Sequence, residues 1–156
     1  MDGPTATIVG ALVGFIGGLV AARVAQQQKA DELFFKALDF LGGGSQKRNL
    51  GIAAIELYWS NKRHRAISVS LLVGSALYLL LQSEQEDATH ELHNLDRIMT
   101  RLLQPDARAY TSRRQYERLL AGVRAAREPK RSAGLHVDNE QLEAWEQSIA
   151  ALVRPS

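Results

Sequence analysis

GPTATIVGALVGFIGGLVAA, residues 3–22, is a run of twenty residues without a charged side chain near the start of a 156-residue chain. An α-helix rises about 1.5 Å per residue, so this stretch is long enough to cross a hydrocarbon core of about 30 Å. Its backbone polar groups would bond within the helix, as lipid requires. The run predicts an N-terminal transmembrane helix.

A ladder of small residues runs along this segment at every fourth position: Ala6, Gly10, Gly14, Gly18 and Ala22. Helices in lipid associate through close backbone approach at Gly and Ala. We expect this small-residue ladder to pack against a second copy or another membrane helix, with the contact centred on Gly14. The alternative is that glycines are simply common in membrane helices.

Basic residues follow the apolar run and do not precede it. Arg23, Lys29 and Lys36 come after it, and the few residues before it include no Lys or Arg. A secretory signal would need a basic start, and basic flanks favour the cytoplasmic side. We therefore expect a single-pass protein of the cell membrane, with its N-terminus outside and its C-terminal domain in the cytoplasm.

Composition limits what the rest of the chain does. The absence of cysteine excludes disulfides and thiolate chemistry, and a net charge of +2 is too small for a strong nucleic-acid footprint. Residues 23–65 hold eight Lys or Arg against four Asp or Glu, whereas residues 82–156 hold eleven against twelve. The excess of basic residues thus lies in the segment nearest the membrane, where anionic lipid headgroups attract positive charge. The residues expected to contact the headgroups are Arg23, Lys47, Arg48, Lys62, Arg63 and Arg65.

Apolar periodicity predicts helices and no strand, so the fold class is all-α: the transmembrane helix followed by a small bundle of helical hairpins. A stripe from Ala30 to Leu41 continues to the glycines at 42–44. A helix over 46–59 follows, capped by Ser45. We expect this helix to bury Leu50, Ala53, Ala54, Leu57 and Tyr58, and we expect an exposed turn over Ser60 to Arg65.

Residues 66–81 contain no charged side chain, and this run has two interpretations, a buried core helix or a second membrane span. Their length lies between that of a buried core helix and that of a short span. The serines in the run, and a capping box of Ser83 with Glu86 after it, favour a core helix. If the run spans instead, both termini would be outside and the basic residues at 62–65 would still be cytoplasmic.

The second half predicts three more helices. One runs over 83–104, with a packing seam of Ala88, Leu92, Leu95, Met99 and Leu102, and Pro105 ends it. Another over 111–127 buries Tyr116, Leu119, Leu120 and Val123. The last is capped by Asp138 with Gln141 reaching back, stapled by Val137 and Leu142, and buries Leu142, Trp145, Ile149 and Leu152. The expected organisation is an anchor over 1–25, a helical domain over 26–128, a polar linker over 129–137 and an amphipathic helix over 138–156.

The phrase LFFKALDFLGGGSQKRNLGIAAIELYW, residues 33–59, reads as helix, Gly-rich turn and helix. It resembles one unit of a HEAT or armadillo-like helical repeat, and the resemblance extends over residues 30–81. The second half does not repeat the phrase at a fixed period. The resemblance implies a protein-binding scaffold and carries no catalytic residues.

Two stretches look like chemical sites and lack the spacing of one. The glycines before Arg48 do not match a phosphate-binding loop. His90 and His93 are three apart, whereas HExxH zinc sites need four, and Asn94 takes that place. No catalytic residue, metal or cofactor is assigned, and we expect no enzyme.

These features predict a membrane-anchored helical adaptor that self-associates through its anchor and binds a protein partner. The alternative is a two-span oligomeric protein that permeabilises membranes or acts like a channel, with Ala66–Leu81 as its second span.

Overall fold

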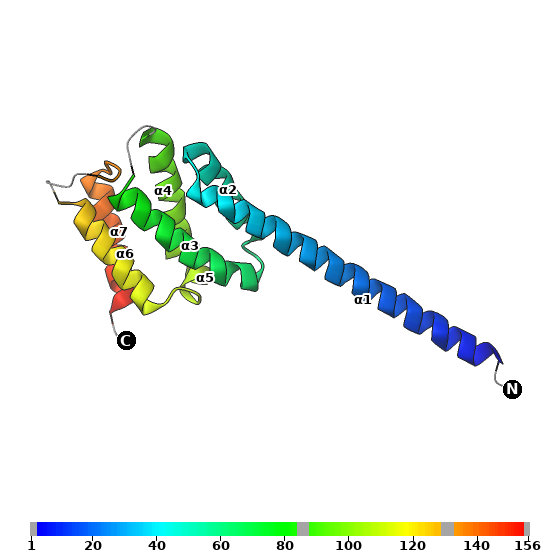
Figure 1. The fold of residues 1–156 in the computed structure, drawn as a ribbon. Helices are drawn as coiled ribbons and strands as arrows, with labels where there is room; N and C mark the ends of the chain where they lie inside the picture. The colour runs from blue at the N-terminus through cyan, green and yellow to red at the C-terminus, as the bar shows by residue number, and fades with distance from the viewer. Residues whose placement is uncertain (1–2, 84–87, 129–132, 155–156) are drawn as a thin grey trace. The chain divides into compact units, whose positions relative to one another are not determined.

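The computed structural model of the chain describes residues 3–83, 88–128 and 133–154. In these ranges the regular structure is entirely helical (Figure 1): α1 Gly3–Leu38, the 3-10 helix η1 Asp39–Gly42, α2 Ser45–Tyr58, α3 Lys62–Leu81, α4 Ala88–Leu103, α5 Pro105–Arg108, α6 Arg113–Ala126 and α7 Asn139–Val153. The predicted all-α class is confirmed. The chain divides into two compact units, residues 1–36 and residues 37–156.

The first unit is a single helix. α1 runs without a break from the uncharged segment into the amphipathic stripe. On its surface Lys36 Nζ donates to Glu32 Oε1 at 2.9 Å, one turn apart. Each partner shifts the pKa of the other: the Glu32 carboxyl is held below its usual range and the Lys36 ammonium above it.

The second unit is a bundle of helices. α3 packs on α4 and α6, α2 packs on η1 and α4, and α7 packs on α6 (Figure 1). Apolar side chains from five helices fill the centre and are almost completely buried: Ile52, Ile55, Val69, Leu72, Leu79, Leu95, Ile98, Met99, Leu119 and Ile149. Burial of this kind is the main stabilising contribution to a small helical domain.

Several predicted boundaries differ from the structure around the glycine turn. α1 ends at Leu38 rather than at the glycines, and η1 occupies the next four residues. The N-cap of α2 is Gly44, and Ser45 is the first helical residue with no side-chain cap bond, so the predicted Ser45 cap is wrong. An extended Gly44 places Ser45 one position too far into the helix to cap it.

The basic cluster after α2 is helical and not a turn. Asn61 is the N-cap of α3, and its side chain accepts a hydrogen bond from the Arg63 amide at 3.0 Å. This cap starts the helix at Lys62, four residues before the apolar run. The first turn of α3 therefore carries the charges that were predicted to lie in a loop.

The linker predicted over 129–137 is partly packed structure. Residues 129–132 lie outside the described part of the chain, as does Glu86 of the predicted capping box. Beyond them, the Gly134 amide donates to the Ser83 carbonyl at 3.2 Å, and the Leu135 amide donates to the Leu79 carbonyl at 2.9 Å. Leu135 is fully buried, so this segment closes the end of α3.

Gly134 is held in the left-handed region at φ +96°. A Cβ at this position would lie 2.0 Å from the Leu80 carbonyl oxygen. Both observations require glycine here, because L side chains avoid this backbone region and no space is left beside α3.

The last two helices follow the sequence closely. α6 buries the four predicted side chains and gains a capping box in which Ser112 and Gln115 bond each other's backbone amides. Asp138 caps α7 by accepting from the Glu140 amide at 2.9 Å. Gln141 does not reach back to this cap and donates instead to Asp96 Oδ1 of α4 at 2.8 Å.

Candidate functional site

The outer face of α3 is the feature of the bundle best suited to binding. The opposite face of this helix supplies much of the core, whereas the outer face carries Leu71, Gly74, Leu77, Tyr78 and Leu81. Leu71 is 37% exposed and Tyr78 is 41% exposed. A groove lies on each side of this face, and Gly74 and Tyr78 line both.

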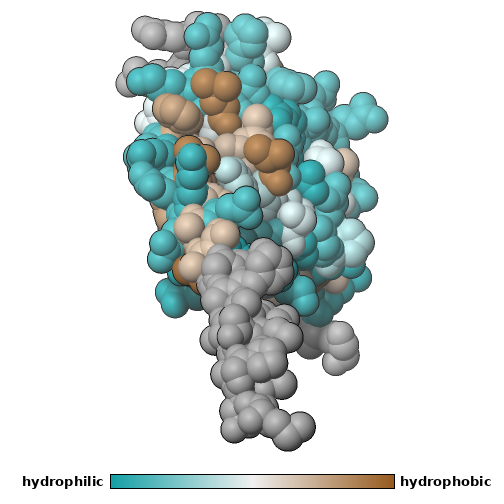
Figure 2. All heavy atoms as spheres, turned by 90° about the vertical axis from the view of Figure 1, so that its right-hand side faces the viewer, coloured by the Kyte–Doolittle hydropathy of each residue, from teal (hydrophilic) through white to brown (hydrophobic). Residues whose placement is uncertain are grey.

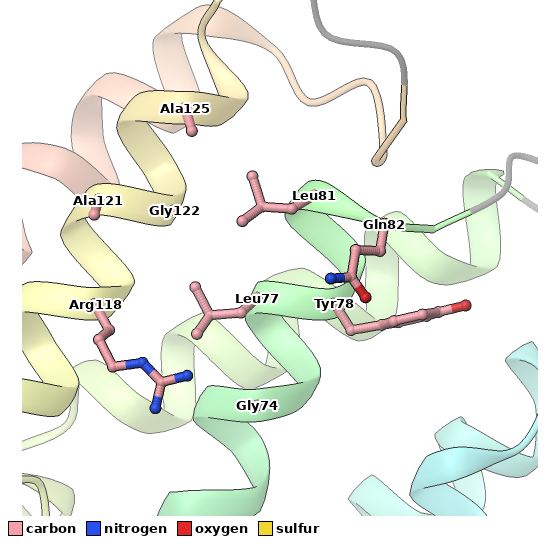
Figure 3. A pocket seen from close by; sticks show the side chains of 9 residues that line it. All are labelled: Gly74, Leu77, Tyr78, Leu81, Gln82, Arg118, Ala121, Gly122 and Ala125. Carbon is pink, nitrogen blue, oxygen red and sulfur yellow. The ribbon is translucent and has the colours of Figure 1, made fainter.

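The first groove, of about 580 Å³, lies between α3 and α6. Figure 3 shows Leu77 and Leu81 extending from α3 toward the small residues Ala121, Gly122 and Ala125 of α6. A Cβ on Gly122 would approach Leu77 Cδ2 to 2.5 Å, so the glycine gives this leucine room. Most of the residues that line this groove on both helices are therefore small or apolar.

Arg118 supplies the charge of this groove. It is exposed on α6 and stands at the end of the groove nearer Gly74 (Figure 3). Within the described part of the chain no ion pair engages it, and no Asp or Glu lines the groove. Its charge is therefore available to a ligand.

Three arginines in or next to α6 form ion pairs, in contrast to Arg118. Arg113 Nε lies 3.0 Å from Glu117 Oε1, and Arg124 and Arg127 hold the two carboxylate oxygens of Glu146 at 2.8 Å and 2.7 Å. The hydrogen bonds from these two guanidinium groups hold the pKa of Glu146 below its usual range.

The second groove, of about 400 Å³, lies between η1 and α3. Arg48, which is only 4% exposed, lines it and is held on several sides. It forms an ion pair with Glu91 of α4, donates to the carbonyls of Leu41 and Gly43 at 3.2 Å and 3.0 Å, and stacks 5.1 Å from the centroid of the Tyr78 ring.

The predicted headgroup residues fall into two groups. Arg48 is buried with Glu91, and the Arg65 side chain is 15% exposed, donates to the Trp59 carbonyl at 2.9 Å and lies 3.8 Å from Asp106. Both are committed within the bundle, and we remove them from the headgroup set. The remaining members lie on the surface of their helices: Arg23, Lys47, Lys62 and Arg63.

The predicted buried stripe of α2 is wrong. Leu50 is 57% exposed and Leu57 is 76% exposed, whereas Ile52 and Ile55 are each 1% exposed. α2 is apolar on two faces, and packing selects the one carrying Gly51, where a Cβ would come within 2.9 Å of Leu41. The other face leaves Leu50 and Leu57 exposed. Figure 2 shows that hydrophobic residues, in brown, are scattered among hydrophilic ones, in teal, on the face of the molecule toward the viewer.

The ladder residues lie within the continuous helix α1; Ala22 is exposed, and the side-chain surroundings of Ala6, Gly10, Gly14 and Gly18 are outside the described structure. His90 and His93 line a pocket of about 340 Å³ with Asn49 of α2. Across the described ranges, no three His, Cys, Asp or Glu side chains are grouped to hold a metal ion.

Gly74 and Arg118 were not singled out from the sequence. A glycine in the middle of a sixteen-residue uncharged run was the available signal, because glycine weakens a helix unless something requires it. Nothing in the local sequence connects Arg118 to Gly74, which lies 44 positions earlier in the chain.

Comparison with known proteins adds no family. No family model matches the chain, and no curated protein or solved structure is significantly similar to it. The resemblance of residues 30–81 to a HEAT or armadillo-like unit stays a prediction.

Proposed function

We propose that this chain is a membrane-anchored helical adaptor. Residues 3–22 of α1 cross the cell membrane once, the small-residue ladder associates with a second copy or another membrane helix, and the bundle binds a protein partner in the cytoplasm. Twenty uncharged residues within one continuous helix support the anchor. Arg23, Lys47, Lys62 and Arg63 are the residues we assign to anionic headgroups.

The outer face of α3 is the observation that carries the binding role. Exposed apolar side chains on a helix, rimmed by grooves and polar residues, are typical of interaction sites. The grooves are open and run beside a helix, which suits a partner helix laid into them better than an enclosed small molecule. We assign no catalytic step to the chain.

A two-span protein is the second candidate, and one observation favours it. By length and composition, α3 is able to cross a membrane, and 44% of its most apolar window is buried in the bundle. Spanning would require α3 to leave α4 and α6 and to carry buried His64 and Ser68 into lipid. That cost favours the single-span adaptor.

The location of the C-terminus separates the two candidates. Paired reporters, one active only in the cytoplasm and one only outside, are fused to the C-terminus, while a tag locates the N-terminus. A cytoplasmic C-terminus with an external N-terminus supports one span. Both termini outside would support two spans and remove the adaptor. Flotation of the full chain with membranes after alkaline washing tests the anchor itself.

A further inference from the structure

Gly74 is a glycine that the bundle does not require. It lies in the interior of α3, where glycine is less favourable than alanine because it costs backbone entropy and packs no side chain. A Cβ built on it meets no atom within 4 Å. Its φ is not positive, since Gly134 alone has that conformation among the described glycines.

The neighbouring buried glycines differ from Gly74 in this respect. A Cβ on Gly51 would come within 2.9 Å of Leu41, and one on Gly122 within 2.5 Å of Leu77, so both serve packing inside the bundle. Gly74 is exposed and lies on the boundary shared by the two grooves. The open space above it is thus part of the outer face of α3.

We infer that the partner of this face is a helix that crosses α3 at Gly74 and bears a carboxylate that pairs with Arg118. This inference rests on the proposed adaptor function and specifies the partner's chemistry. A glycine on one helix lets a second backbone approach closely, with larger side chains packing on either side of the crossing. Leu71, Leu77 and Tyr78 flank Gly74 in this way.

The charge of the two grooves selects the partner. Neither groove is lined by Asp or Glu; Arg118 lines the first, and Arg48, already paired with Glu91, lines the second. An acidic helix therefore complements the face. A second copy of this chain would bring the same cations and no carboxylate from this face, which disfavours self-association here.

The test is a selection from a displayed peptide library. The library encodes helices of about five turns, with Ala, Gly or Leu on one stripe and Glu or Lys, at equal frequency, elsewhere. The full chain is presented in nanodiscs of zwitterionic lipid, and empty nanodiscs measure background. We expect enriched peptides to carry Glu in excess over Lys, and we expect Arg118→Glu to reverse this preference.

Gly74→Leu should weaken the enriched peptides by at least about tenfold, because it fills the crossing point. Ala144→Leu, the control, adds the same side chain on the exposed surface of α7 and should leave binding unchanged. Gly74→Ala should raise the urea midpoint of the bundle while reducing binding. This combination separates a binding role from a folding role.

Four results would contradict this inference about the partner helix. Enrichment without an excess of Glu, binding that ignores Gly74→Leu, or no enrichment over empty nanodiscs would overturn the inference. So would a Gly74→Leu chain that loses self-association, since the face would then belong to a second copy. Failure of the adaptor proposal is seen separately, because a chain without an anchor would not float with membranes.

Discussion

Replacing Glu91 with alanine should destabilise the bundle severely, because it leaves the Arg48 guanidinium buried without its counter-charge. The two side chains are 5% and 8% exposed and form an ion pair between α2 and α4. Arg48 would keep the carbonyls of Leu41 and Gly43, at 3.2 Å and 3.0 Å, and its stacking contact with the Tyr78 ring. These partners carry no full negative charge, so they do not replace the carboxylate beside a buried guanidinium group.

Breaking a buried pair on one side costs about 3–5 kcal/mol, against a total stability of about 5–15 kcal/mol for a typical domain. Removing both charges together should cost far less. Arg48→Met with Glu91→Leu fills the site with apolar atoms, and such replacements are neutral or stabilising by about 1–4 kcal/mol in other proteins. The double variant is therefore the matched control.

Tryptophan fluorescence during urea unfolding measures this change in the full chain. The chain has two tryptophans, Trp59 and Trp145; both belong to the second unit and are 6% and 7% exposed. The signal thus reports the bundle and not α1. A Glu91→Ala loss below about 1 kcal/mol, the range of an exposed ion pair, would refute the reasoning that the pair is desolvated.

Four further outcomes follow from the structure. Gly134→Ala should lower the stability of the bundle by at least about 2 kcal/mol in the same assay, since a positive φ and a clash with α3 act together. Leu57→Ser should change stability by less than about 0.5 kcal/mol, whereas Ile55→Ser should cost at least about 2 kcal/mol; a larger loss for Leu57→Ser than for Ile55→Ser would support the stripe predicted from the sequence instead. Gly14→Ile should abolish self-association of the full chain in a membrane dimerisation reporter, and an unchanged signal would remove the ladder contact. The Glu146 carboxyl should titrate by NMR below the midpoint of an unfolded peptide; because its folded pKa is depressed, its stabilising contribution is present above the unfolded pKa and is lost as the pH falls through the folded value.

Local signals predicted the helices better than they predicted their faces. α6 and α7 have one apolar stripe and side-chain caps at Ser112 and Asp138, so their burial and their starts are decided within a few residues. α2 has two apolar faces, and the choice between Leu57 and Ile55 depends on which face meets Leu41 and α4. Tertiary contacts decide which of the two faces is buried, and the periodicity of the sequence does not reveal it.

The candidate site could not be predicted from the sequence, because it too depends on tertiary packing. The walls of its first groove come from α3 and α6, which are separated along the chain by α4 and α5 and lie side by side only in the folded bundle. The headgroup residues were also predicted from their positions along the chain, and position alone does not reveal that Arg48 forms an ion pair with Glu91 of α4. Gly74 alone was recognisable in advance, as an unfavourable residue inside a helix.

In the proposed adaptor, the unbroken course of α1 would also set how far apart two associated copies of this helix stand. Right-handed pairs of small-residue helices cross at about 40°, so two copies meeting at Gly14 would diverge on both sides of that point. From Gly14 to Lys36 each helix extends about 33 Å, and at half the crossing angle the two axes would stand about 23 Å apart there. A pair of copies joined through α1 would carry two copies of the proposed docking face, and a partner with two acidic helices would bind the pair with the gain of bivalency.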